Sequence, residues 1–211
     1  MVLFILYLFR MSKDSLSKAE RTRRFIIEKT APVFNTKGYA GTSLGDLTEA
    51  TGLTKGSIYG NFTNKDEVAL AAFDYNFEKV TSYLKNKILS KENAIDRLLA
   101  YPLVYRDFLK IPFLQPGCPI LNTSTEADDT HPELRAKAAD ALAFWKRSVE
   151  NQVKRGIERK EIKSDVHPAG FAVILCSLIE GAVMQAKVTG KSGDLRIAMN
   201  FLEKLIRDMA Y

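Results

Sequence analysis

Apolar residues recur at helical spacing along nearly all of this 211-residue chain, and this periodicity constrains the fold more than any other feature. No stretch alternates apolar and polar residues between turn-forming clusters, as a strand in a half-buried sheet would. With 46% hydrophobic residues the chain can bury a sizeable core and hold one or two domains. The sequence therefore predicts an all-α fold of about nine helices.

Residues 42–66 read as two short helices joined by a tight turn, followed by the start of a third helix. Gly52 breaks the first helix, Thr54 is a natural N-cap for the second, and Asn64 with Glu67 has the spacing of a capping box. A short helix with an exposed polar face suits the major groove of DNA better than an enzyme site. The segment is a predicted helix-turn-helix.

The positive charge of the chain is concentrated around this motif. The formal net charge is +6, of which residues 1–65 carry +5 and the remainder +1. A protein that binds phosphates needs its charge on the part that meets the nucleic acid. The distribution favours double-stranded DNA as a partner over a merely solvated basic segment.

Cysteines and histidines are too few and too scattered for a metal site, and they suggest no disulfide framework: the chain has Cys118, Cys176, His131 and His167. We expect a reducing cytoplasm and no cofactor. An enzyme with Cys118 as nucleophile would lack a nearby base, because His131 lies 13 residues away. The chain is therefore not expected to be an enzyme.

The first nine residues form an apolar run that is too short to span a bilayer, which needs about 20 residues. The run also lacks the basic start and the small-residue cleavage site of a signal peptide. We interpret residues 1–10 as a misassigned or disordered leader, with Met11 as the true first residue; a membrane-touching tail is the alternative. The expected domains are 11–64 for DNA binding and 65–211 for the rest.

Two runs in the first third of the chain resemble the tetracycline-repressor (TetR/AcrR) family of bacterial one-component regulators. They are Phe34-Asn-Thr-Lys-Gly-Tyr-Ala-Gly-Thr-Ser and Lys55-Gly-Ser-Ile-Tyr-Gly-Asn-Phe-Thr-Asn-Lys. A looser resemblance continues through Gly117-Cys-Pro-Ile-Leu-Asn, His131-Pro-Glu-Leu-Arg, Glu180-Gly181 and the closing helix from Gly190 to Ile206.

This resemblance implies a three-helix DNA-binding domain and a C-terminal helical domain that binds a small molecule and dimerises. The expected function is that of a repressor that binds a palindromic operator as a homodimer and is released by an unidentified small-molecule inducer. The family interface is built from the last two helices of each subunit. No membrane association follows from it.

The expected DNA contacts divide into phosphate contacts and base readers. The phosphate contacts are Thr42, Thr54, Tyr59 and Lys65, and the base readers are Lys55, Ser57 and Asn61. Gly56 would let the backbone approach the DNA closely. Packing of Tyr59 on the domain is the alternative for that residue.

Two further sets belong to the C-terminal domain. The candidate effector pocket is Tyr101, Tyr105, Phe108, Cys118, Trp145, Met184 and Gln185, although an aromatic stripe at helical spacing is also typical of a core. Residues 168–188 are apolar nearly all round, which requires burial in a core or against a partner. The candidate dimer contacts are Phe171, Leu175, Leu178, Ala182, Phe201 and Leu205.

Cys118 follows Pro116-Gly117 at the expected start of a short helix, where the helix N-terminus lowers the pKa of a thiol. An alternative function is therefore a redox or electrophile sensor that acts through Cys118 on the same DNA-binding head. A small buried residue in a helix cap is the structural alternative.

Overall fold

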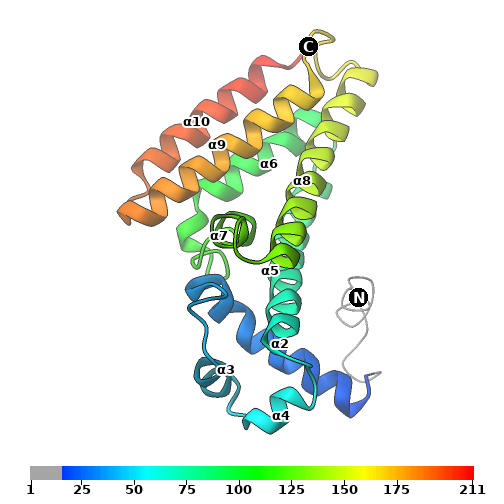
Figure 1. Ribbon diagram of the computed structural model, residues 1–211. Helices are drawn as coiled ribbons and strands as arrows, with labels where there is room; N and C mark the ends of the chain where they lie inside the picture. The colour runs from blue at the N-terminus through cyan, green and yellow to red at the C-terminus, as the bar shows by residue number, and fades with distance from the viewer. Residues whose placement is uncertain (1–15) are drawn as a thin grey trace. The chain divides into compact units, whose positions relative to one another are not determined.

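The computed structural model describes residues 16–211, which form nine α-helices (Figure 1). In chain order they are α2 (Lys18–Lys37), α3 (Leu44–Thr51), α4 (Lys55–Tyr59), α5 (Lys65–Leu89), α6 (Ala94–Arg106), α7 (Pro119–Ala127), α8 (Pro132–Glu158), α9 (Pro168–Thr189) and α10 (Gly193–Asp208). A 3₁₀ turn covers Phe108–Lys110, and an isolated antiparallel bridge joins Ile162 to Ala210. The predicted all-α fold is confirmed; the predicted leader, residues 1–10, lies outside the described residues.

The chain divides into two compact units. The first, here called the head, comprises the described residues up to Lys79 together with Asn122–Ala138. The second, the C-terminal unit, comprises Val80–Leu121 and Ala139–Tyr211. The head thus includes more than the expected residues 11–64, because the first turns of α5 contribute Val68 and Ala72 to its core.

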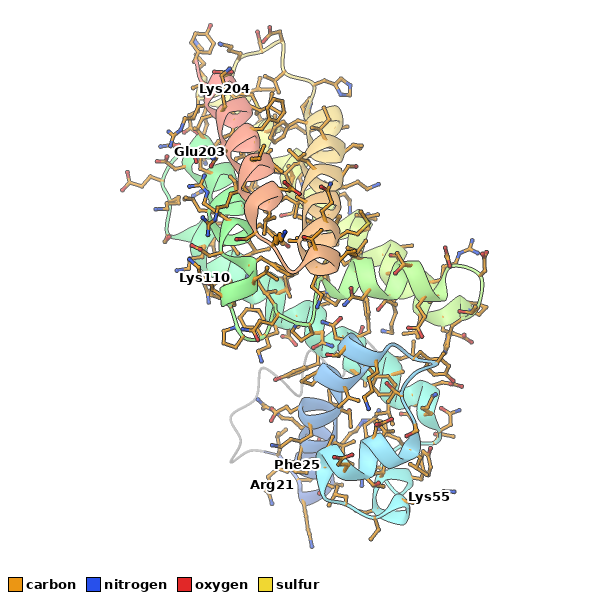
Figure 2. All side chains as sticks on the ribbon, turned by 90° about the vertical axis from the view of Figure 1, so that its left-hand side faces the viewer. Arg21, Phe25, Lys55, Lys110, Glu203 and Lys204 are labelled. Carbon is orange, nitrogen blue, oxygen red and sulfur yellow. The ribbon has the colours of Figure 1, made fainter. Side chains whose placement is uncertain are left out.

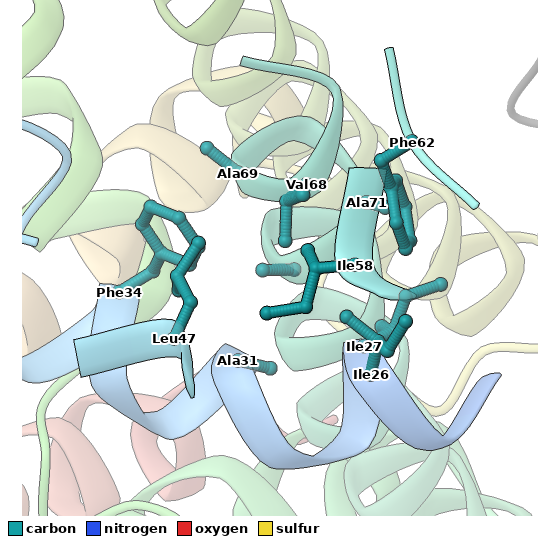
Figure 3. Close-up of a cluster of buried hydrophobic side chains, with 11 residues drawn as sticks. Ile26, Ile27, Ala31, Phe34, Leu47, Ile58, Phe62, Val68, Ala69 and Ala71 are labelled. Atoms are coloured by element: carbon teal, nitrogen blue, oxygen red, sulfur yellow. The ribbon is translucent and has the colours of Figure 1, made fainter. Parts of the chain in front are cut away.

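The core of the head is a cluster of aliphatic and aromatic side chains from α2, α3, α4 and α5 (Figure 3). Its members are Ile26, Ile27, Ala31, Phe34, Leu47, Ile58, Phe62, Val68, Ala69, Ala71 and Ala72. Helical spacing places these residues on the inner faces of their helices. Burial of this apolar surface holds the short helices α3 and α4, which would not be stable alone.

Local capping signals set the ends of the helices in the head. Ser17 and Glu20 form a capping box at the start of α2, and Thr54 caps α4 as predicted. Gly38 and Gly52 end α2 and α3 with φ values of 73° and 68°, a region that favours glycine. A proline inside a helix usually bends or shortens it, but α2 continues through Pro32 to Lys37.

Thr130 and Glu133 have the sequence spacing of a capping box for α8, but the Thr130 hydroxyl donates to the Glu126 carbonyl at 2.5 Å. His131 takes the capping position instead, since its Nδ1 accepts from the backbone N–H of Leu134 at 3.3 Å. Either cap gives nearly the same start for the helix.

In the C-terminal unit, α10 packs on both α6 and α9 (Figure 1). The contact face of α10 is fully buried and consists of Leu195, Met199, Leu202 and Ile206. By length and composition α9 could also cross a membrane, but one side of it lies in the core of this unit. That burial is typical of the central helix of a globular domain.

Three of the expected dimer contacts on α9 lie on the side of the helix that is buried in its own chain. Phe171, Leu175 and Ala182 are buried within their own chain, so they are not offered to a partner. The outer side of the helix instead exposes an apolar set: Val173, Ile174, Met184 and Val188. Because α9 is apolar nearly all round, its sequence predicted burial but not which side faces inward.

Candidate functional site

The exposed face of α4 carries the predicted base readers. Thr54 Oγ1 accepts from the Ser57 backbone N–H at 3.2 Å, and Ile58 turns into the core. This orientation leaves Gly56 exposed and Ser57 partly exposed. Lys55 is exposed as well (Figure 2). A short, capped helix with a polar outer face has the geometry of a recognition helix.

Asn61 lies just beyond α4 and is held inside the head. Its Nδ2 donates to the Ser57 carbonyl at 2.9 Å, and its own backbone carbonyl accepts from the Arg23 guanidinium. Arg23 also pairs with Glu67 at 2.7 Å and lies 3.9 Å from the centre of the Phe62 ring. Arg23 therefore fixes the end of the recognition helix, a role that no local pattern in the sequence indicated.

Two predicted phosphate contacts have structural partners. Thr42 is fully buried, and its hydroxyl donates to the Gly38 carbonyl at 2.6 Å, so it is not available to phosphate. Ser43, not Thr42, caps α3. Lys65 donates from Nζ to the carbonyls of Tyr39 and Thr42 at 2.8 and 2.9 Å, which uses two of its three N–H groups.

Tyr59 is partly buried and packs against the head core, as its alternative interpretation predicted. The ring covers apolar surface, while a tyrosine hydroxyl can still act as donor or acceptor. Packing and DNA contact are therefore compatible for this residue.

The turn between α2 and α3 is hydrogen-bonded to a carboxylate that is remote in sequence. Glu126 accepts from the backbone N–H groups of Tyr39 at 2.7 Å and Ala40 at 2.8 Å. A Cβ at Gly38 would lie 2.4–2.6 Å from this carboxylate, so any side chain there would displace Glu126 from the two amides. Asn122 adds a bond from Nδ2 to the Asn35 carbonyl at 2.8 Å.

The side chain of Tyr39 is held by α5 and by the start of α8. Its hydroxyl donates to Asp66, and this bond raises the pKa of Tyr39 to about 12. His131 meets the ring edge-on, with the centres 4.6 Å apart. The turn that positions α3 and α4 is thus fixed from several directions.

Five of the predicted pocket residues are buried in the C-terminal unit: Tyr101, Tyr105, Phe108, Cys118 and Trp145. The Trp145 ring stacks near Tyr101 and Tyr105 at 6.4 and 6.0 Å between ring centres. Tyr105 stacks near Phe108 at 5.8 Å. We call Tyr101, Tyr105, Phe108 and Trp145 the aromatic cluster.

The other two predicted pocket residues are not part of this interior. Met184 is 48% exposed, and Gln185 is also exposed, both on α9. Both residues lie on the side of α9 that faces away from the core of its unit. The structure therefore does not bring Met184 and Gln185 together with the aromatic cluster.

Cys118 lies in an environment that suppresses its thiolate. Burial and the nearby Glu180 carboxylate raise the pKa of the Cys118 thiol well above its usual value. The backbone N–H groups of Leu121 and Ile120 act in the opposite direction but are outweighed. The expectation of a lowered thiol pKa is therefore wrong, because desolvation exceeds the effect of the helix N-terminus.

Glu180 is a site residue to which sequence reasoning gave no role, although Glu180-Gly181 is part of the family resemblance. The Cys118 thiol donates to its Oε1 at 2.9 Å, while Oε2 is buried without a hydrogen-bond partner. Burial raises the pKa of Glu180 to about 7. A single acid within an apolar helix was the available signal in the sequence.

Two family models match the chain. Residues 26–72 match "Bacterial regulatory proteins, tetR family", and residues 94–202 match "Tetracyclin repressor-like, C-terminal domain". The match to the first model includes the whole recognition helix. The match to the second includes the aromatic cluster and Glu180.

Solved structures and curated relatives agree with these matches. A TetR-family regulator from Cytophaga hutchinsonii is 46% identical, with a TM-score of 0.86 over 93% of this chain and 98% of that one. One from Chloroflexus aurantiacus is 36% identical, with a TM-score of 0.87 over 92% and 98%. The repressor DhaR of Mycobacterium sp. (strain GP1) is 24% identical over 79% of this chain and 82% of its own.

The exposed recognition helix, the all-helical fold and these likenesses agree with one another. The chain belongs to the TetR family of helix-turn-helix, DNA-binding transcriptional regulators, which are not enzymes.

Proposed function

We propose that this regulator is a repressor that binds an inverted-repeat operator as a homodimer and leaves it when a small molecule binds. The exposed polar face of α4, fixed by Arg23 and the Thr54 cap, is the observation that carries the proposal. A twofold protein reads a twofold site, so the operator is an inverted repeat. Because it acts on the bacterial chromosome, it works in the cytoplasm.

Base reading is assigned to the exposed positions of α4 and its end. Lys55 donates to guanine, and Asn61 pairs with adenine when its amide turns away from the Ser57 carbonyl. Ser57 reads either kind of base. Gly56, which carries no side chain, allows the backbone to approach the DNA.

Phosphate contacts come from groups that keep a free donor. The Thr54 hydroxyl accepts within the helix cap and can still donate outward. Lys65 retains a third N–H, and Tyr59 offers its hydroxyl. The buried Thr42 takes no part, and its hydroxyl supports the turn instead.

Dimerisation is assigned to the exposed apolar sides of α9 and α10. On α10, Ile197 and Phe201 are 69% and 60% exposed, and Leu205 is half-buried. On α9, Val173 and Ile174 are half exposed, and Leu178 is half-buried. Contiguous exposed apolar surface of this kind marks a protein interface.

The effector is assigned to the interior around the aromatic cluster. Buried aromatic side chains with a few unsatisfied polar groups are typical of a small-molecule site. A covalent sensor acting through Cys118 is disfavoured by the burial and raised pKa of that thiol. The variant Cys118→Ser should therefore keep the full response.

Operator binding tests the proposal directly. Fluorescence anisotropy would compare DNA from upstream of the gene with a scrambled duplex, over a range of salt. We expect sequence-specific binding that weakens steeply with salt and falls about tenfold or more in Lys55→Ala. Lys85→Ala, which alters an exposed lysine of the C-terminal unit, is the matched control and should leave the affinity unchanged.

A genomic selection of bound fragments extends the test beyond the neighbouring promoter. Recovery of an inverted repeat supports the proposal. Failure to enrich any sequence, with the protein folded by circular dichroism, would overturn it.

A further inference from the structure

Arg23 of α2 contacts the turn that follows the recognition helix in three ways. Its Nη1 donates to the Asn61 backbone carbonyl, and its Nη2 donates to Glu67 of α5 at 2.7 Å. The central carbon of the guanidinium lies 3.9 Å from the centre of the ring of Phe62, a residue of the head core (Figure 3). The Arg23 side chain is only 15% exposed, so these contacts are made inside the head.

Glu67 completes the support of this turn. Its Oε2 accepts from the Thr63 backbone N–H at 2.7 Å, while its Oε1 pairs with Arg23. One ion pair between α2 and α5 thus bonds a carbonyl and an N–H group of the same turn, those of Asn61 and Thr63. Helix ends leave such backbone groups without partners inside the helix, so charged side chains that bond them fix the course of the turn.

The side chain of Asn61 lies next to this fixed turn. In the free head its Nδ2 donates to the Ser57 carbonyl at 2.9 Å. To bond the edge of an adenine in two places, the amide must leave that carbonyl. Asn61 borders a hollow of about 280 Å³ at the end of α4, which gives the amide room to turn. Its backbone carbonyl stays bonded to Arg23, so the side chain turns about a fixed backbone position.

We propose that Arg23 is a positioning residue for operator specificity: it holds the Asn61 backbone and so sets which base pair the Asn61 amide reaches. This inference rests on the proposed function, because it concerns the same DNA-reading surface. The contacts of Arg23 are with protein groups, in contrast to those of an arginine that donates to a phosphate.

The planar guanidinium suits this role better than a point charge does. It donates in two directions from a rigid fork and stacks on an aromatic face at the same time. Lysine carries the same charge on a single nitrogen and cannot reproduce all three contacts. The variant Arg23→Lys therefore separates geometry from charge.

Hydrogen exchange of the free protein tests the positioning without DNA. The backbone N–H groups of Asn61, Phe62 and Thr63 are all hydrogen-bonded in the structure. We expect these three amides to exchange at least tenfold faster in Arg23→Ala than in the unaltered protein, because the turn loses its support from α2.

Arg24 provides the matched control. It also lies on α2 with a similarly buried side chain, and it bonds Glu28 of the same helix at 2.9 Å. Arg24→Ala should leave the exchange of the three amides unchanged. If Arg23→Ala does not fold, Arg23→Lys supplies both the exchange and the DNA-binding measurements.

Binding to DNA tests the specificity. Fluorescence anisotropy would compare a duplex that the unaltered protein enriches from a random pool with the single-base-pair variants of that duplex. Asn61→Ala identifies the base pair that Asn61 reads, at which the unaltered protein should discriminate about tenfold or more. Arg23→Ala and Arg23→Lys should both reduce this discrimination to less than about threefold and leave it intact at the base pair read by Lys55.

The effect of charge distinguishes positioning from direct contact with DNA. Removal of an arginine that binds a phosphate lowers the slope of log affinity against log salt by about one. We expect this slope to be unchanged in Arg23→Ala. Glu67→Ala removes the opposite charge and should reduce discrimination at the same base pair, whereas a purely electrostatic contact predicts opposite effects of the two variants.

The outcomes separate this inference from the proposed function. Unchanged amide exchange in Arg23→Ala, retained discrimination in Arg23→Lys, or a salt slope lower by about one would overturn the role of Arg23 even if an operator is found. If the unaltered protein enriches no sequence, the proposed function is overturned. Faster exchange of the three amides would then still support Arg23 as the residue that holds the end of the recognition helix.

Discussion

The carboxylate of Glu126 accepts the backbone N–H of Tyr39 at 2.7 Å, although 87 residues separate them in the chain. Its second oxygen accepts from the next N–H, that of Ala40. Two consecutive amides of the turn before α3 therefore depend on one side chain of α7. The orientation of the recognition helix follows from this turn.

Removal of this carboxylate should loosen the turn. We expect Glu126→Ala to lower the free energy of unfolding by about 1–3 kcal/mol, because two N–H groups lose a charged acceptor. Glu126→Gln keeps one acceptor oxygen and should cost less. Urea unfolding would measure both, and amide hydrogen exchange at Tyr39 and Ala40 would locate the change.

The exposed Asp129, three residues further along, supplies the control. Asp129→Ala should change neither the unfolding curve nor the exchange of the two amides. Unaltered exchange at Tyr39 and Ala40 in Glu126→Ala would show that Glu126 does not stabilise these two amides.

Gly38 should be less tolerant of a side chain than Gly45 or Gly52. Gly38→Ala combines a positive φ of 73° with a Cβ placed against the Glu126 carboxylate. The backbone strain alone costs about 1–2 kcal/mol, and the crowding adds to it. Thermal unfolding and operator affinity would both report the loss.

Two other glycines isolate these contributions. Gly52 has a φ of 68° and a ψ of 11°, the left-handed helical region, and open space around it, so Gly52→Ala should show the smaller strain of that region without crowding. Gly45 lies inside α3, where alanine is the better helix former, so Gly45→Ala should be neutral or stabilising. Equal losses at Gly38 and Gly52 would argue against crowding by Glu126.

Local signals in the sequence were sufficient for the elements of the head. The helix stop at Gly52 and the cap at Thr54 each act within four residues, and the structure has both where the pattern predicted. Such signals are readable because the interacting groups are close in the chain.

Contacts between distant residues could not be read in the same way. Arg23 bonds the Asn61 carbonyl 38 residues away, and Glu126 reaches Tyr39. Thr42 illustrates the reverse error, since its position beside a helix start suggested phosphate contact while the fold buries it. Chemistry and spacing name candidate groups, but packing decides which of them face outward.

The exposed side of α10 should control oligomeric state. Phe201 is 60% exposed, and Phe201→Glu would place a charge within the proposed apolar interface. Sedimentation equilibrium should give a dimer for the unaltered chain and a monomer for the variant, with weaker operator binding. Leu89→Glu changes an equally exposed leucine of α5 and should remain dimeric; dimers in both variants would place the interface elsewhere.

Stability should fall with rising pH through the titration of Glu180. Its pKa is raised from 4.5 to about 7 in the folded protein, so the folded state binds more protons between these values. Because the unfolded state then holds fewer protons, the free energy of unfolding decreases as pH rises. The stabilisation by the protonated acid is complete below about pH 4.5 and lost above about pH 7.

The difference between the unaltered protein and Glu180→Gln isolates this group from the other carboxyls. Glutamine cannot ionise, so the variant should gain relative stability as pH rises from 5 to 8, by up to about 3 kcal/mol. Urea unfolding at several pH values would measure the gain. If the difference in free energy of unfolding between the two proteins does not change with pH, the pKa of Glu180 is the same in the folded and unfolded states. The carboxyl would then not be buried without a partner.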